Sequence, residues 1–282
     1  MTIKKAILLP LSAAVLASCA YAPTHIGKSI EFKPVEETSS SDIVKDHYNI
    51  LYIGNSFTYY NNIDEVTVAL ATSLGLNITS KKFAVGSQKL AQSASSEDAL
   101  GAQIDADLNA HHDYTDIILQ DQSTTPLSSY TSFLSGVAKL KKKINATQDR
   151  ADIHLYETWS FPGMTGYAND LKGGEAALRE AYRKAGSVMQ IGVDYVGIAF
   201  QYINEHHPEI NLYWSDNKHP SFAGTYLSAA THLATIANVD VTNATYIGSS
   251  STFYDGVPCL LNQADANILL SVASGVASGA IK

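Results

Sequence analysis

The chain of 282 residues has few residue types that could cross-link it or give it a strong charge. Its two cysteines are too few for a disulfide framework or a zinc scaffold built on paired cysteines. Charged residues make up only 16% of the chain, with 27 acidic against 19 basic side chains and a formal net charge of −8. Such a balance provides no basic surface for a phosphate backbone, so no nucleic-acid partner is expected. The hydrophobic content of 45% predicts an ordinary folded domain.

The first 18 residues have the features of an export signal. Two lysines precede an apolar run at 6–16, which is far shorter than the roughly 20 residues of a membrane-spanning helix. The run ends in Leu-Ala-Ser-Cys at 16–19, which resembles the signal of bacterial lipoproteins. That resemblance implies acylation of Cys19, and Ala20 after it implies the outer membrane, on its periplasmic or surface face. The alternative is plain secretion with a coincidental cysteine.

The rest of the chain divides into a tether and one domain. Residues 19–46 are polar, with two prolines and a run of three serines, and are expected to form a flexible tether between lipid and domain. No repeat or low-complexity linker interrupts residues 47–282, so a single domain is expected there. Cys259 is expected to be a small buried side chain and not a nucleophile.

Short apolar runs alternate with segments of helical periodicity from residue 49 onward. The runs expected to form strands buried on both faces are 50–53, 82–85, 116–119, 153–156 and 195–198. Helices are expected over 64–74, 97–110, 130–147, 174–190, 220–237 and 264–277. This alternation predicts an α/β fold, with a parallel sheet of about five strands between helical layers. Ligands of such sheets bind beyond the carboxyl ends of the strands, so the chemistry is expected in the loops that follow them.

The loop after the first expected strand carries a candidate nucleophile. In the sequence Gly-Asn-Ser-Phe-Thr at 54–58, Gly54 allows a sharp turn, and Ser56 would stand near backbone N–H groups that can stabilise an oxyanion. Thr58 excludes the GxSxG elbow of α/β-hydrolases. Considered alone, a serine in such a turn is more often a helix cap than a nucleophile.

A second candidate group lies at 215–221, which reads Ser-Asp-Asn-Lys-His-Pro-Ser. Asp216 and His219 are three residues apart, so the carboxylate can accept from one imidazole nitrogen while the other acts as a base. In the alternative interpretation, Asp216 and Ser221 cap the helix expected to begin near Pro220, and His219 is solvated surface.

Together the two motifs resemble the first and last blocks of the SGNH (GDSL-like) hydrolase family, and most closely its exported bacterial members whose first block reads Gly-Asn-Ser-Phe-Thr. The resemblance covers roughly residues 49–238 and implies a flavodoxin-like three-layer α/β/α sandwich. It also implies a catalytic triad of Ser56, His219 and Asp216. An oxyanion hole formed by the Ser56 backbone N–H, Gly86 and Gln122 is implied as well.

The third block departs from the family pattern GxND. Here the sequence is Gln120-Asp121-Gln122, so Gln122 takes the place of the asparagine with one more methylene of reach, and Gln120 takes the place of the glycine. Oxyanion donors act only when they are correctly placed, so this exchange decides whether Gln122 can serve as the third donor.

The resemblance implies a serine esterase that works through an acyl-enzyme and needs no cofactor. Its expected substrates are carboxylic esters, above all acetyl esters, of small molecules or polysaccharide. Asn55, Gln120 and Trp159 are candidates for the substrate pocket, although Trp159 is equally explained as a core aromatic, as are Tyr59, Tyr60 and Trp214. Adjacent histidine pairs lack a chelating spacing, so no metal is expected. The alternative function is a non-catalytic, glycan-binding envelope lipoprotein on the same fold.

Overall fold

The computed structural model describes residues 45–282. The expected signal peptide at 1–18, the acylation site Cys19 and the tether as far as residue 44 lie outside the described residues. Within 45–282, no helix combines the length and the apolar character that a bilayer-spanning segment requires.

A parallel sheet of five strands forms the centre of the fold, in the order β2-β1-β3-β4-β5. The strands are β1 (Tyr48–Gly54), β2 (Ile78–Ala84), β3 (Asp116–Leu119), β4 (Asp152–Glu157) and β5 (Gly192–Tyr195). The central strands β1 and β3 are buried almost throughout, which explains their continuous apolar sequences. Because the order reverses between β1 and β3, the carboxyl ends of these two strands mark the switch point of the sheet.

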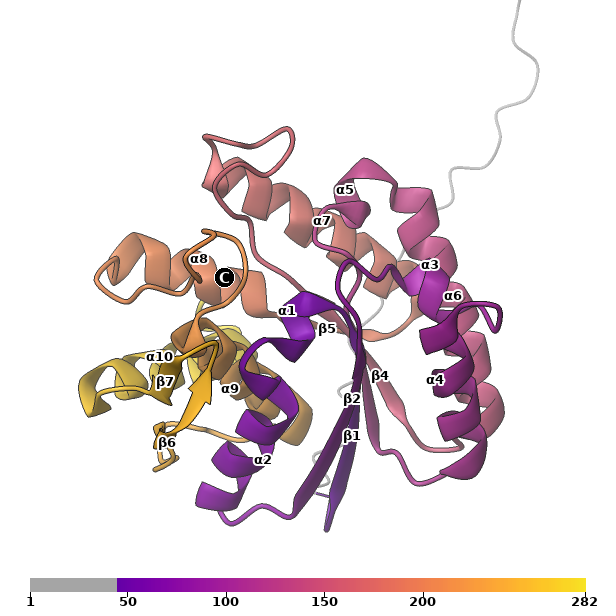
Figure 1. The fold of residues 1–282 in the computed structure, drawn as a ribbon, viewed down its shortest axis with the longest axis horizontal. Helices are drawn as coiled ribbons and strands as arrows, with labels where there is room; N and C mark the ends of the chain where they lie inside the picture. The colour runs from indigo at the N-terminus through magenta and orange to yellow at the C-terminus, as the bar shows by residue number, and fades with distance from the viewer. Residues whose placement is uncertain (1–44) are drawn as a thin grey trace, which may run out of the picture. The chain divides into compact units, whose positions relative to one another are not determined.

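Helices cover both faces of this sheet (Figure 1). One layer contains α2 (Ile63–Ser73), α8 (Val196–His206), α9 (Phe222–Ala237) and α10 (Gln263–Ala277). The other contains α3 (Leu90–Ser93), α4 (Ala99–Ala110), α5 (Thr125–Ser128), α6 (Tyr130–Thr147) and α7 (Leu171–Met189). The short helix α1 (Ser56–Tyr59) follows β1. The expected three-layer flavodoxin-like sandwich is confirmed.

The prediction of a strand over residues 195–198 is wrong. Strand β5 ends at Tyr195, and residues 196–198 form the first turn of α8. The side chains of Val196 and Ile198 are buried there. A short buried apolar run carries no periodicity that separates a strand from the start of a buried helix, so the sequence did not indicate α8.

An antiparallel hairpin, β6 (Gly248–Tyr254) and β7 (Val257–Leu260), lies outside the main sheet. Asp255 and Gly256 form its two-residue turn with φ values of 49° and 79°, as the mirror-image turns of hairpins require. Cys259 in β7 is buried, which confirms its expected place, and burial raises the pKa of its thiol.

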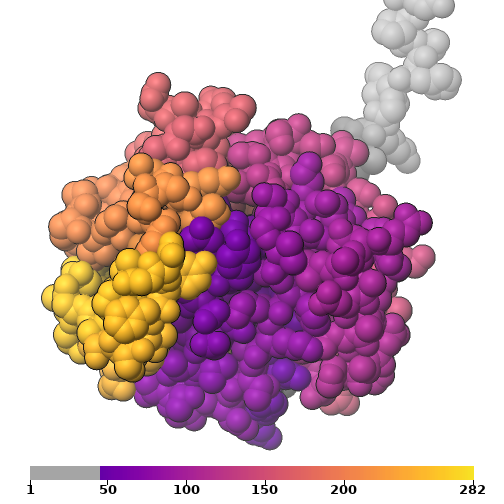
Figure 2. Space-filling model, viewed as in Figure 1, coloured from indigo at the N-terminus to yellow at the C-terminus, as the bar shows by residue number. Residues whose placement is uncertain are grey.

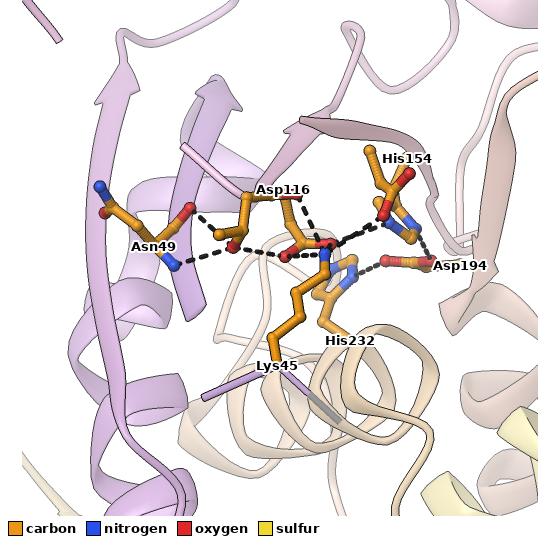
Figure 3. A network of polar contacts seen from close by, with 8 residues as sticks. Lys45, Asn49, Asp116, His154, Asp194 and His232 are labelled. Carbon is orange, nitrogen blue, oxygen red and sulfur yellow. Dashed lines mark hydrogen bonds and ion pairs between the residues drawn. The ribbon is translucent and has the colours of Figure 1, made fainter. Parts of the chain in front are cut away.

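A polar network lies toward the amino ends of the central strands (Figure 3). Lys45 Nζ is 3.0 Å from the carboxylate of Asp116, the first residue of β3. His154 of β4 lies between Asp116, at 3.5 Å, and Asp194 of β5, at 2.9 Å. The second oxygen of Asp194 is 2.6 Å from Nδ1 of His232, which is fully buried in α9. The network therefore links the segment before β1, three strands and one helix.

Candidate active site

The turn from β1 into α1 places Ser56 at the carboxyl end of a central strand. Gly54 is required in this turn, because a Cβ there would lie 2.2 Å from Thr58 Oγ1. Asn55 caps α1, since its Oδ1 accepts a hydrogen bond from the backbone N–H of Phe57 at 3.2 Å. Ser56 is the first residue of the helix, where backbone N–H groups have no partner within the helix. Its N–H is therefore suited to stabilise a nearby oxyanion.

Asp216 and His219 lie in a tight loop before α9. One Asp216 carboxylate oxygen accepts from the backbone N–H groups of Lys218 and His219, each at 3.0 Å, and the other accepts from His219 Nδ1. The loop is closed by the Trp214 N–H, which donates to the His219 carbonyl at 2.7 Å. Partial burial acts to raise the pKa of Asp216, but the hydrogen bonds outweigh it and hold that pKa below its usual range. Asp216 therefore stays ionised and fixes the orientation of the imidazole.

The fold brings Ser56 and His219 together across 163 residues of sequence. Ser56 Oγ lies 2.8 Å from His219 Nε2, within the distance that proton transfer requires. Because Nδ1 donates to Asp216, Nε2 of a neutral imidazole is free to accept the serine proton. The helix-cap interpretation holds only for Ser221, the N-cap residue of α9. The three sequence-predicted triad residues thus form one chain of hydrogen bonds.

Trp159 lies in the core and does not line a pocket. Its side chain is 0% exposed, because the indole is stacked between the rings of Phe57, at 4.5 Å, and Phe200, at 4.0 Å. Its Nε1–H donates to the carbonyl oxygen of Lys218 at 3.1 Å. One buried side chain therefore contacts Phe57, which follows Ser56, and Lys218, which precedes His219, and it links the two loops.

Asn55 and Gln120 are also buried, at 2% and 1% exposure, so the prediction that they line a substrate pocket is wrong. Gln120 Oε1 accepts from the Asn55 backbone N–H and from the Thr58 hydroxyl, both at 2.9 Å. Asn55 Nδ2 donates to the carbonyl of Gln88 at 2.9 Å. These hydrogen bonds join the loops that follow β1, β2 and β3. Both side chains therefore stabilise the arrangement of these three loops and do not face a ligand.

Gly86 lies in the exposed turn after β2, in which the Gln88 N–H donates to the Val85 carbonyl at 3.2 Å. A Cβ at Gly86 would stand 3.5 Å from the hydroxyl of Tyr59, the last residue of α1. The turn thus lies beside the short helix that begins with Ser56. Its role in an oxyanion hole stays a prediction.

Gln122 is engaged at the start of α5. Its Oε1 accepts from the backbone N–H groups of Thr124 and Thr125 at 3.0 and 3.1 Å, and its Nε2 donates to Ser123 Oγ at 3.2 Å. No contact joins the Gln122 side chain to Ser56 in the described part of the chain. A primary amide carries two hydrogens, so one remains for an oxyanion. The part of Gln122 as third donor therefore also stays a prediction.

Asn61 supports the site in a way that the sequence did not indicate. Its backbone is left-handed, with φ of 52°, and its buried Nδ2 donates to the Pro220 carbonyl at 3.1 Å and to Thr225 Oγ1 at 2.9 Å. Because Pro220 directly follows His219, this amide ties the segment after α1 to the histidine loop. Asparagine signals a left-handed turn, but no sequence pattern reveals partners about 160 residues away.

The adjacent histidine pairs at 111–112 and 206–207 make no contact with Ser56, Asp216 or His219 among the described residues. His112 Nδ1 is 2.8 Å from the Thr147 carbonyl, and His207 Nδ1 is 3.3 Å from Glu209. Among residues 45–282, no group of three or more histidine, cysteine or acidic side chains is placed to hold a metal ion.

Comparison with known proteins identifies the architecture. No protein-family model matches the chain, and no curated protein matches its sequence. A DUF4886 family protein from Bacteroides uniformis matches with a TM-score of 0.65 at 16% identity, covering 84% of this chain and 96% of its own. A proposed SGNH hydrolase from Slackia heliotrinireducens matches with a TM-score of 0.52 at 26% identity, covering 65% and 95%.

The chain has the fold of the SGNH hydrolases. A proposed GDSL-like lipase from Parabacteroides merdae shares this SGNH fold, with a TM-score of 0.52 at 14% identity over 70% of this chain and 98% of its own. Within the SGNH fold of this chain, Ser56 stands at the β1/β3 switch point, where doubly wound sheets bind their ligands.

Proposed function

We propose that the protein is a serine esterase with the triad Ser56, His219 and Asp216. The observation that carries the proposal is the 2.8 Å contact between Ser56 Oγ and His219 Nε2, with Nδ1 of the same ring on Asp216. A serine and a histidine in a helix cap or on a solvated surface have no reason to meet in this order. The SGNH fold and its GDSL-like neighbours agree with hydrolase chemistry.

The reaction follows from the proton positions. His219 Nε2 takes the proton of Ser56 as Oγ attacks the ester carbonyl, and the ionised Asp216 stabilises the imidazolium that forms. The Ser56 backbone N–H and Gly86, with Gln122 as a third donor, stabilise the oxyanion. His219 then protonates the leaving alcohol oxygen, and the acyl group stays on Ser56. A water molecule, deprotonated by the same nitrogen, releases the acid and restores the free serine.

Acetyl esters, as small molecules or on polysaccharide, are the proposed substrates, and the cell envelope is the proposed location. Acylation of Cys19 would anchor the chain, with the outer membrane as the expected site. A Cys19→Ala variant should move from the membrane fraction to the soluble fraction of the envelope. If the variant stays with the membrane after residues 1–18 have been removed, the anchor is not this cysteine.

Activity toward p-nitrophenyl acetate and labelling by a fluorophosphonate test the triad directly. Ser56→Ala should lose the label and lower turnover by about 10⁴ or more, as triad removal does in other serine hydrolases. Ser215→Ala is the matched control, because this exposed serine lies next to Asp216 and outside the triad. Unchanged turnover in Ser56→Ala would refute the esterase.

The same labelling experiment separates the esterase from a non-catalytic glycan-binding protein. The altered third block keeps that alternative open, because Gln122 takes the place of the family's asparagine and its amide nitrogen already donates to Ser123. An activated serine reacts with the phosphonate, whereas a serine that only binds or caps does not. Wild-type protein that resists the label would favour the binding function.

A further inference from the structure

Four aromatic side chains form a continuous, partly exposed group that begins at His219. The ring of Tyr60 is stacked on the imidazole, with centroids 4.3 Å apart and planes within 6°. Tyr59 is stacked on Tyr60 at 5.5 Å, and Tyr254 contacts Tyr60 at 5.0 Å. Trp214 meets Tyr254 edge to face at 6.2 Å. We call Tyr59, Tyr60, Trp214 and Tyr254 the aromatic platform.

The platform is assembled from three segments that are distant in sequence. Tyr59 and Tyr60 end the turn after Ser56, Trp214 belongs to the histidine loop, and Tyr254 is the last residue of β6. The space-filling view agrees, because the yellow C-terminal segment lies directly beside the indigo segment that follows β1 (Figure 2). The hairpin β6–β7 therefore contributes a side chain next to the candidate active site.

The hairpin register fixes which side chain faces the site. Tyr254 pairs with Val257, and Phe253 pairs with Pro258. Because successive side chains of a strand point to opposite faces, Tyr254 faces the platform while Phe253, 57% exposed, faces away. Phe253 is thus a matched neighbour of Tyr254 that cannot share its contacts.

The platform adjoins His219, because Tyr60 is stacked on its imidazole. In the proposed reaction, His219 Nε2 protonates the leaving alcohol oxygen, so that oxygen must come within reach of the ring and the platform can hold the rest of the alcohol. Aromatic faces favour flat, weakly hydrated surfaces. Burial and Tyr59 raise the pKa of the Tyr60 phenol, and the carboxylates of Asp216 and Asp255 lie close enough to this ring to raise it further. The Lys218 ammonium lies 5.1 Å from the centroid of the Phe161 ring and not over the platform rings. The two carboxylates favour a neutral alcohol over an anionic one at Tyr60.

We propose that the aromatic platform binds the alcohol part of the ester, and that this alcohol is a neutral six-membered ring. The proposal rests on the esterase function above and names the class of its substrate. A pyranose and an aryl ring both present such a face, so the source of the ring is decided by experiment.

Three acetate esters that differ only in the alcohol test the platform: ethyl acetate, phenyl acetate and an acetylated methyl glucopyranoside. The double variant Trp214→Ala/Tyr254→Ala should raise KM about tenfold for a ring ester and leave kcat/KM for ethyl acetate within about twofold. For each ester, the value of kcat/KM in wild type is divided by its value in the variant. This ratio removes the differences in reactivity between the leaving groups. A larger ratio for the glucoside identifies a pyranose, and a larger ratio for phenyl acetate identifies an aryl ring.

Phe253→Ala is the control and should leave all three ratios near one. An equal loss for ethyl acetate and both ring esters would overturn the proposal, because the rings would then only hold His219. Ratios near one for all three esters in the double variant would overturn it too.

Binding without turnover separates this proposal from the esterase function. The chain has two tryptophans, and Trp159 is sealed between two rings, so a ligand on the platform should change the fluorescence of Trp214. In Ser56→Ala, methyl glucopyranoside or phenol should produce this change, and Trp214→Ala should abolish it. Binding with no hydrolysis in the wild type would refute only the esterase, whereas no spectral change with either ring alcohol refutes the platform.

Discussion

Two groups of the same chemistry, an aspartate with a histidine, lie in opposite regions of this fold. In the candidate active site, Asp216 and His219 are 41% and 19% exposed, and the free imidazole nitrogen meets Ser56. In the network toward the amino ends of the strands, Asp194 is fully buried, and its partner His154 meets a second carboxylate, Asp116.

The second carboxylate changes what the buried histidine can do. Burial acts to lower the pKa of His154, but the charges and hydrogen bonds of Asp194 and Asp116 raise it to about 10. Burial likewise acts to raise the pKa of Asp194, but His154 and His232 lower it to about 2. An imidazole that stays protonated cannot act as a base. A contact with aspartate therefore does not make a histidine catalytic, and the group on its other nitrogen decides.

The largest expected effect concerns the partly exposed pair Asp216 and His219, where activity and stability should respond differently to a substitution. His219→Gln removes the base, so kcat/KM for p-nitrophenyl acetate should fall by about 10⁴. The side chain is partly exposed and its hydrogen bonds are local, so the free energy of unfolding should fall by only about 1 kcal/mol. Steady-state kinetics and urea unfolding of the same preparation check both. A large loss of the free energy of unfolding in His219→Gln would mean that the Asp216–His219 pair stabilises the fold as the buried Asp194–His154 pair does.

The buried pair Asp194 and His154 should show the opposite result, a loss of stability with little loss of activity. Asp194→Asn keeps the shape but leaves the His154 charge without its main partner, which should cost about 3 kcal/mol of the free energy of unfolding. The folded variant should keep kcat, because Ser56 and His219 lie at the other ends of the strands. Urea unfolding measures the loss, and a large fall in kcat at full folding would contradict the division of roles.

The pH dependence of stability sharpens the comparison further. Against the effect of burial, the two buried carboxylates raise the pKa of His154 to about 10 in the folded protein, whereas its pKa in the unfolded chain is about 6.5. This contribution is complete below the lower value and is lost as the pH rises through the upper one, with a slope approaching about 1.4 kcal/mol per pH unit. Urea unfolding across this range should show the slope in wild type and not in His154→Gln. Parallel profiles would show that His154 is neutral.

The smallest expected effect concerns the link that Trp159 makes between Phe57, which follows Ser56, and the histidine loop. Trp159→Phe keeps an aromatic ring between Phe57 and Phe200 but removes the hydrogen bond to Lys218. The loop should shift slightly, lowering kcat about tenfold with little change in KM. Phe200→Leu is the matched control, since it disturbs the packing and keeps the bond, and should lose stability with a smaller fall in kcat. Equal kcat values in Trp159→Phe and wild type would remove the positioning role.

Elements with one dominant signal could be predicted from the sequence. Strand β3 and helix α6 have the expected bounds, because a fully buried run and a long amphipathic segment are unambiguous. Strand β2 begins four residues before its expected start, because an edge strand with an exposed face has polar residues. The serine-rich strand β6 has no apolar alternation, so the hairpin and the place of Tyr254 were not predicted.

In the candidate active site, too, local contacts could be predicted from the sequence and contacts between distant segments could not. Asp216 and His219 could be paired from their spacing, because a three-residue separation fixes their contact locally. The contacts of Trp159 with Phe57 and Lys218 depend on how loops from different strands meet, which the sequence does not encode locally. The pairing of His154 with Asp194 depends on the register of β4 and β5 in the same way.

The contact of Lys45 with Asp116 has a consequence for orientation. It fixes the point where the chain enters the domain at the amino end of β3, whereas Ser56 stands beyond the carboxyl end of the neighbouring strand. Within the described residues, the point of entry and Ser56 therefore lie at opposite ends of two neighbouring strands, so the segment that precedes the domain does not approach the candidate active site through Lys45.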